Sequence, residues 1–199
     1  MKVKFLKSPI LHFSLLAALT GGIVSCGNND GTRTNADTKE VAEDKNDAKF
    51  DSAKMEKDAQ FLVNAAEINL EEIKLGQLAQ EHGMSNDIKT LGQTMVEAHT
   101  KALSDLKSLA QSKTISIPDA PTKDANDAWE KLQKEKGKDF DKKYCDMMVD
   151  GHKDAIDKFE KAATDAHDPQ IKQWASSMLP DLRKHLDMSM TCQNKLEKK

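Results

Sequence analysis

Four polar side chains stand where the helical pattern of this sequence otherwise places apolar residues: Glu72, His99, His152 and His185. Neutral imidazoles and a carboxylate are suitable ligands for zinc, iron, copper or manganese. The same groups can instead form a buried layer held by hydrogen bonds and ion pairs, because each needs a polar partner once it leaves water. Both interpretations, a metal site and a purely structural polar layer, are open at this point.

The four residues are paired about two breaks in the helical pattern. The acid and the first histidine are equidistant from a break at residues 85–86, and the other two histidines are equidistant from a break at residues 168–169. In an antiparallel helical hairpin, residues equidistant from the loop lie at the same height. His99 and His152 each lie about 14 residues from a helix end, roughly 20 Å at the helical rise, which is near mid-length. The spacing therefore predicts one polar layer in the middle of a helical bundle.

A standard di-iron centre does not fit this pattern. That design takes Glu from two helices and a Glu-x-x-His motif from each of the other two. Val96, Val149 and Leu182 stand three residues before the histidines, where the second set of carboxylates is required.

Two cysteines follow the same geometry. Cys145 and Cys192 are equidistant from the break at 168–169, two helical turns or about 10 Å from the histidines of the same hairpin. In an oxidising compartment such a pair is expected to form a disulfide. Two buried free thiols, or thiolates that join a metal, are the alternatives, and the distance from the histidines argues against the thiolates.

The elements that must position these residues are helices. Apolar residues recur at steps of three and four over residues 61–79, 88–109, 145–162 and 171–196. Each such stripe gives a helix one face to pack against the others. We therefore expect an all-α fold, a four-helix bundle over residues 55–197.

The connection between the second and third long helices sets the topology. It is roughly 25 residues long, whereas a simple helical hairpin needs about 2 to 8. It contains two prolines and a short predicted helix around Trp129 and Leu132. A connection of this length can run back along the bundle, so we expect a ferritin-like arrangement with a long crossover rather than a plain up-down-up-down bundle.

The composition agrees with a helical domain. The 199 residues include 6 Phe, 2 Trp and 1 Tyr, and 32% of them are charged. So few aromatic residues, with only 9 Gly, argue against a sandwich or barrel of many short strands. The formal net charge of -3 argues against a nucleic-acid partner, which requires a concentrated basic face.

The first 25 residues are typical of an export signal. Three lysines precede an apolar stretch at residues 10–19, which is too short for the roughly 20 residues that span a bilayer. The run Ile23, Val24, Ser25 and Cys26 resembles a bacterial lipobox, so we expect lipidation of Cys26 and membrane attachment through its acyl chains. An ordinary cleaved signal is the alternative. Because Gly27 rather than Asp follows the cysteine, we expect the outer membrane, with the protein facing the periplasm.

Residues 26–54 are predicted to form a disordered tether. They are mostly Asn, Asp, Thr, Lys and Glu, with almost no large apolar side chain. Such a segment buries too little surface to offset its ordering entropy.

Four motifs, the third of which has two parts, resemble those of the domain of unknown function 4142 family. They are LEEIKLGQLA at 70–79, MVEAH at 95–99, FDKKY at 140–144, MVDGH at 148–152 and LPDLRKHL at 179–186. The resemblance covers roughly residues 58–196 and implies an exported bacterial protein with a ferritin-like bundle, but no established activity. The recurrent acidic and histidine positions of the family correspond to Glu72, His99, His152 and His185. One departure is Ala98, where many members carry Asp.

No motif of a known reaction is present: the sequence lacks a glycine-rich phosphate loop, a GxSxG elbow and an HExxH motif. The sequence therefore favours a non-catalytic envelope lipoprotein whose bundle contains a buried Glu/His layer. The first alternative is a metal-binding ferritin-like protein of the periplasm, active in redox chemistry or metal storage. The second is an interaction or scaffold module of the envelope. The only partner predicted is the membrane, through the lipid on Cys26.

Overall fold

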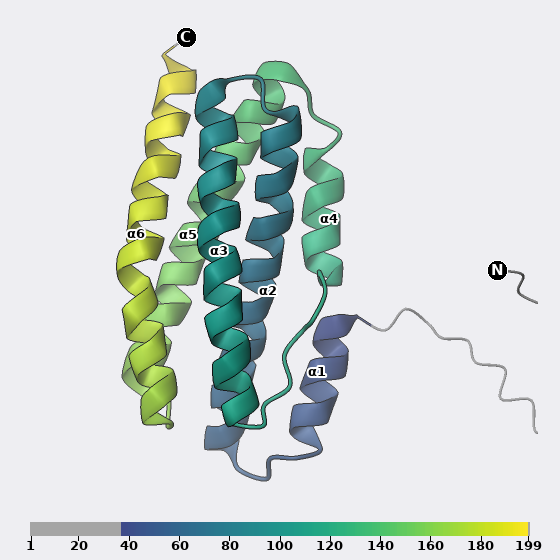
Figure 1. Cartoon of the computed structure of the whole chain (residues 1–199), viewed down its shortest axis with the longest axis vertical. Coiled ribbons are helices and arrows are strands. Elements are labelled where there is room, and N and C mark those ends of the chain that lie inside the picture. The colour runs from purple at the N-terminus through teal and green to yellow at the C-terminus, as the bar shows by residue number, and fades with distance from the viewer. Residues whose placement is uncertain (1–36, 199) are drawn as a thin grey trace, which may run out of the picture. The chain divides into compact units, whose positions relative to one another are not determined.

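The computed structural model describes residues 37–198, which form helices joined by short loops (Figure 1). The predicted signal peptide, Cys26 and the first part of the predicted tether lie outside these residues. No helix within residues 37–198 is long and apolar enough to cross a membrane. The helices of the described part are α1 (Thr38–Asp47), α2 (Ala53–His82), α3 (Asn86–Ser112), α4 (Lys123–Leu132), α5 (Gly137–Asp165) and α6 (Pro169–Glu197).

The four long helices form two hairpins, α2 with α3 and α5 with α6. Ser85 caps α3 by accepting a hydrogen bond from the backbone N–H of Ile88. Asp168 caps α6 in the same way, with Pro169 in the first turn. The two breaks predicted from the sequence are therefore the two hairpin loops.

A buried carboxylate from each hairpin binds the loop of the other. Asp141, near the start of α5, accepts hydrogen bonds from the backbone N–H groups of Met84 (2.8 Å) and Ser85 (3.0 Å) in the α2–α3 loop. Asp58, near the start of α2, accepts from the N–H groups of His167 (2.8 Å) and Asp168 (2.7 Å) in the α5–α6 loop. The starts of α3 and α5 consequently lie at the same end of the bundle, and these two helices run parallel.

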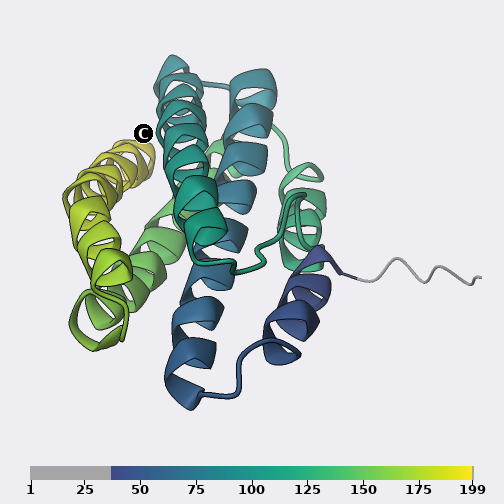
Figure 2. The same ribbon diagram turned by 60° about the horizontal axis from the view of Figure 1, so that its bottom comes forward.

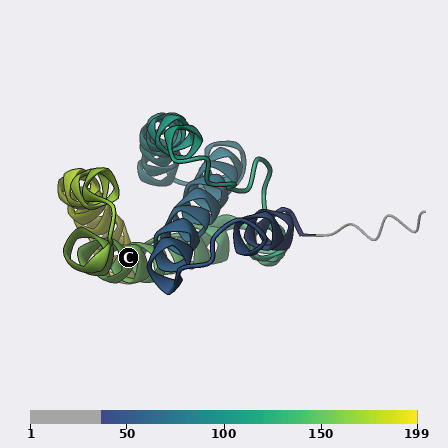
Figure 3. The ribbon, with the colours of Figure 1, turned by 90° about the horizontal axis from the view of Figure 1, so that it is seen from below.

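Parallel α3 and α5 require the long crossover that the sequence predicts, and this expectation is confirmed. The chain leaves the end of α3, returns along the bundle and forms α4 before it enters α5 (Figure 1). α4 is the short helix predicted around Trp129, and it packs on α2, where the Lys74 ammonium lies 4.9 Å from the centre of the Trp129 ring. Seen along the bundle, α1 and α4 lie on the side of α2 away from α6 (Figure 3).

The prediction of a disordered tether is wrong for residues 38–54, because this segment contains α1 and the start of α2. Ala42 and Phe50 are buried, and the Asn46 side chain binds both the N–H and the C=O of Ser116 at 2.8 Å. Figure 2 shows α1 beside the α3–α4 connection. The helix is held by polar contacts with this connection and by little apolar surface, which is why its composition resembles that of a disordered segment.

Two apolar clusters fill the bundle, one on each side of a polar layer. Along α2, Leu70 belongs to one cluster and Leu75 to the other, and Glu72 lies between them. Along α5, Ala155 and Met148 flank His152 in the same way. The predicted polar layer therefore lies between the two halves of the core.

Candidate metal centre

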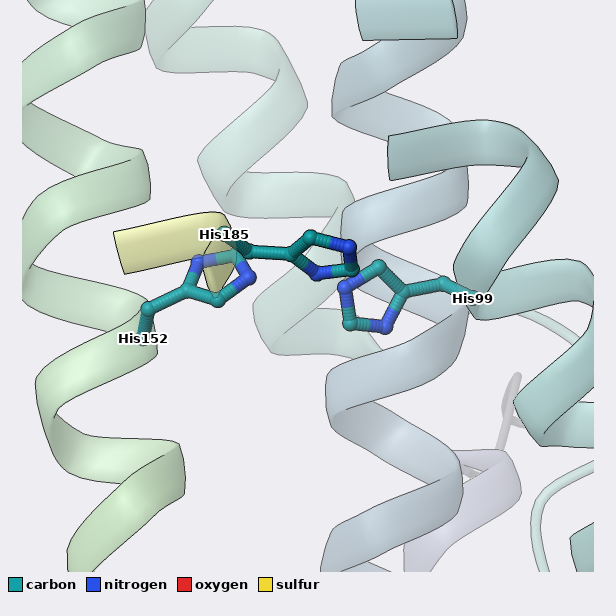
Figure 4. A group of neighbouring side chains, drawn as sticks. All are labelled: His99, His152 and His185. Atoms are coloured by element: carbon teal, nitrogen blue, oxygen red, sulfur yellow. The ribbon is translucent and has the colours of Figure 1, made fainter. Parts of the chain in front are cut away.

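Three histidines from three helices meet in this polar layer. His99 comes from α3, His152 from α5 and His185 from α6, and their rings point toward one another (Figure 4). The ring centroids are 5.4 to 5.6 Å apart, and one ring nitrogen of each residue lies within 4.8 Å of the other two. The residues are 3%, 1% and 5% exposed, respectively, so the group is almost completely shielded from water.

Hydrogen bonds fix which nitrogen carries the proton in two of the rings. His152 Nδ1 lies 2.9 Å from the Met148 carbonyl oxygen, which can only accept, so Nδ1 donates. His99 Nδ1 lies 3.0 Å from Asn69 Oδ1, and this amide is oriented by the hydrogen bond from its Nδ2 to the Ala65 carbonyl. His99 Nδ1 therefore also donates. In both rings the lone pair is left on Nε2.

These lone pairs accept no hydrogen bond from the described part of the chain. Nε2 of His99 and Nε2 of His152 are buried and have no hydrogen-bond partner among residues 37–198. Nδ1 of His185 is likewise buried and unpartnered there. Each ring thus brings one unsatisfied nitrogen to the same dry layer, where an unpaired polar group is costly.

The environment keeps the three rings neutral. Burial lowers the pKa of His99 well below its usual value, and repulsion from the other two rings lowers it further. Burial also lowers the pKa of His152 to about 4, against the opposing effect of its hydrogen bond to Met148. The pKa of His185 is lowered by burial as well. Neutral imidazole is the form that binds a metal ion.

Glu72 reaches the same layer but does not join the three histidines. Its Oε1 lies 3.6 Å from Nδ1 of His152, the nitrogen that already donates to Met148. Its Oε2 is buried and has no hydrogen-bond partner within residues 37–198. Burial, reinforced by the neighbouring Glu71, raises the pKa of Glu72 well above its usual value, which favours the neutral carboxylic acid. The structure therefore brings the three predicted histidines together around one point. It places the fourth predicted residue, Glu72, on the far side of the His152 ring.

Comparison with known families agrees with the motifs. The sequence profile described as "Domain of unknown function (DUF4142)" matches residues 42–191, which include all six helices at least in part. The chain belongs to this family. No curated protein and no solved structure matches this chain. The resemblance drawn from the four motifs is confirmed, and the family supplies no activity.

One further polar residue, Asn69, belongs to the site of this DUF4142 domain, and a second, Tyr144, lies near Glu72. Asn69 orients His99, and it could have been identified as an Asn on the buried face of α2, one turn before Glu72. Tyr144 is completely buried, and its hydroxyl has no partner among the described residues. Burial and the nearby Glu72 raise the pKa of Tyr144 well above its usual value. Tyr144 is the last residue of the motif at 140–144, but the motif alone does not indicate that its hydroxyl is buried near Glu72.

The disulfide predicted between Cys145 and Cys192 is not formed. Both residues are free and buried, and their side chains share a hydrogen bond between α5 and α6. The hydrogen bond and burial raise the pKa of Cys145, so it carries its proton at neutral pH. The equal height of the two cysteines follows from the hairpin register, but the register does not decide whether two adjacent sulfurs are thiols or a disulfide.

Proposed function

We propose that this domain binds one transition-metal ion through His99, His152 and His185. The observation that carries the proposal is the set of three buried, unpartnered ring nitrogens directed at one another. Three imidazoles are a common ligand set for a divalent ion in proteins, and small rotations of the rings bring the nitrogens to one ion.

A purely structural polar layer accounts less well for these residues. Such a layer requires that buried donors and acceptors satisfy one another. Here His99 and His152 both present an acceptor nitrogen, and neither accepts a hydrogen bond from any residue in 37–198. Two lone pairs facing each other in a dry core are unfavourable, and a cation between them removes the penalty.

The surrounding groups suit a metal centre. Asn69 and the Met148 carbonyl each bind the far nitrogen of a ring, which fixes the orientation of that ring and makes its other nitrogen a better ligand. Nitrogen ligands favour zinc, copper or iron over magnesium and calcium, and manganese is also a candidate. Glu72, behind His152, is placed to interact with the charge of the bound ion through the ring rather than as a ligand.

Metal titration of the full-length protein tests this proposal. After treatment with a chelator, the protein should take up one Zn²⁺ per chain, measured by calorimetry and elemental analysis. At a free zinc concentration of about 100 times the dissociation constant, the free energy of unfolding should rise by about 2.7 kcal/mol. His185→Ala should lose both effects, and His167→Ala, which removes an exposed imidazole at the α5–α6 loop, should keep them. Equal unfolding with and without zinc, and no stoichiometric metal, would refute the proposal.

The domain is further proposed to be carried by a lipid-anchored protein of the cell envelope. The support is the Ile23-Val24-Ser25-Cys26 run, which follows an apolar stretch. The membrane we propose is the outer membrane, with the protein facing the periplasm. Acyl chains on Cys26 would hold it there. Cys26→Ser should move the protein from the membrane fraction to the soluble fraction of the cells that produce it. A Cys26→Ser variant that stays in the membrane fraction would contradict the anchor.

A further inference from the structure

A pocket of about 110 Å³ opens beside two of the three histidines. His99 and His185 form part of its wall, with Asn69 and the half-buried Ala102 of α3 next to them. His152 is not part of the wall and lies deeper in the bundle. The pocket thus approaches the group of histidines from one side only, the side of α3 and α6.

The pocket connects these histidines with solvent. Its inner wall includes the buried apolar side chains of Phe159 and Leu182. Its outer part includes the exposed residues Lys101, Asp105 and Asp181, the first two of which form an ion pair at 2.7 Å. A pocket with an apolar interior and a charged rim therefore lies between solvent and two of the three histidines.

We propose that the metal keeps one coordination position open toward this pocket and binds a small anion there. This inference rests on the proposed metal site. Three protein ligands leave a fourth position on a tetrahedral ion, and a fourth position that faces solvent is the mark of a reactive rather than a structural centre. Among residues 37–198 no fourth protein ligand is at hand, because Glu72 approaches His152 from its other edge.

The size and charge of the site define the ligand. An apolar cavity of about 150 Å³ accepts benzene, so the smaller pocket here suits a molecule of about four heavy atoms or fewer. Three neutral imidazoles leave the charge of a divalent ion uncompensated, and the carboxyl group of Glu72 is not a ligand that could offset it, because it lies at the Nδ1 edge of His152. An anion at the open position supplies the missing charge in a dry environment. The expected ligands are therefore small anions such as hydroxide, hydroperoxide or azide.

The inference is tested with the full-length protein loaded with Co²⁺, whose visible absorption responds to its ligands, and with azide as the probe. Azide should change the Co²⁺ spectrum of the wild-type protein in a saturable way. Ala102→Leu adds three carbons inside the pocket and should raise the azide concentration at half-saturation at least tenfold, while Co²⁺ still binds at one per chain. The matched control is Ser104→Leu, which places the same side chain on the exposed face of α3 and should bind azide like the wild type.

The possible failures are distinguishable. A protein that binds no Co²⁺ refutes the proposed function and the inference with it. A Co²⁺ spectrum that does not respond to azide refutes the open position and leaves the metal site standing. An unchanged azide affinity in Ala102→Leu refutes the pocket as the route to the metal.

Discussion

Acid should destabilise the metal-free protein through His152, by an amount that follows from its burial. In the folded protein its pKa is lowered to about 4, whereas an exposed imidazole in the unfolded chain titrates near 6.5. Between these two pH values the unfolded state takes up a proton that the folded state does not. The stability that comes from keeping the ring neutral is fully present above pH 6.5 and is lost as the pH falls to 4. At about 1.4 kcal/mol for each pH unit, the loss is about 3 kcal/mol.

The measurement is urea unfolding of the wild-type protein and of His152→Gln at pH 7 and pH 4, with a chelator present so that no metal contributes. The wild-type protein should lose about 3 kcal/mol more than the variant over this range. The comparison with a variant is needed because Glu72 acts in the opposite direction. Its raised pKa stabilises the folded state at low pH and is lost as the pH rises, and it is present in both proteins. If both proteins lost the same free energy between pH 7 and pH 4, His152 would not be held neutral by burial, and the electrostatic argument for a neutral histidine group would be wrong.

Three other outcomes follow from the packing. Gly92→Ala should lower the free energy of unfolding in urea by about 3 kcal/mol, since a Cβ there lies 2.7 Å from the Gly76 carbonyl oxygen where α2 crosses α3; wild-type stability would contradict this close approach. Alkylation of the denatured, unreduced protein followed by peptide mapping should find Cys145 and Cys192 as free thiols, and a disulfide-linked peptide would show that the two sulfurs are oxidised to a disulfide instead. Asn69→Ala should weaken zinc binding by about 10- to 100-fold in calorimetry, because it removes the group that orients the His99 ring, and an unchanged affinity would exclude that role.

The arrangement of the long helices could be predicted because it depends on periodicity and loop length alone. Stripes at steps of three and four fix which face of a helix is buried, and the register of a hairpin fixes which residues share a height. The register places His152 and His185 at one height, and the distances of His99 and His152 from their helix ends put His99 in the same layer, as observed. The crossover topology followed from the length of the segment between residues 112 and 137, which is too long for a tight turn.

The same rules could not give side-chain direction within a layer. Glu72 has the correct height, but its carboxyl group lies at the Nδ1 edge of His152, and only the rotation of α2 about its own axis decides that. The position of α1 was also beyond reach, because its attachment depends on specific hydrogen bonds between Asn46 and the backbone of Ser116. Neither periodicity nor composition contains this information.

The two hairpins are related by a repeat in the chain, and departures from that repeat create the site. The same number of residues separates Asp58 from Asp141, Met84 from His167 and Ser85 from Asp168, which are the carboxylates and loop N–H groups of the two clamps. Asn69 and His152 are equivalent under this relation, and each hydrogen-bonds to the backbone carbonyl four residues earlier.

The equivalent of His185 is Ala102, across the gap between α3 and α6. A strictly repeated bundle would fill this space with a second ring, whereas the methyl group of Ala102 leaves it to the pocket. Likewise, Asn69 contributes an amide that orients His99 where a repeated bundle would place another imidazole. The frame is therefore nearly two-fold, and the three-histidine site with one open side arises where the two halves differ.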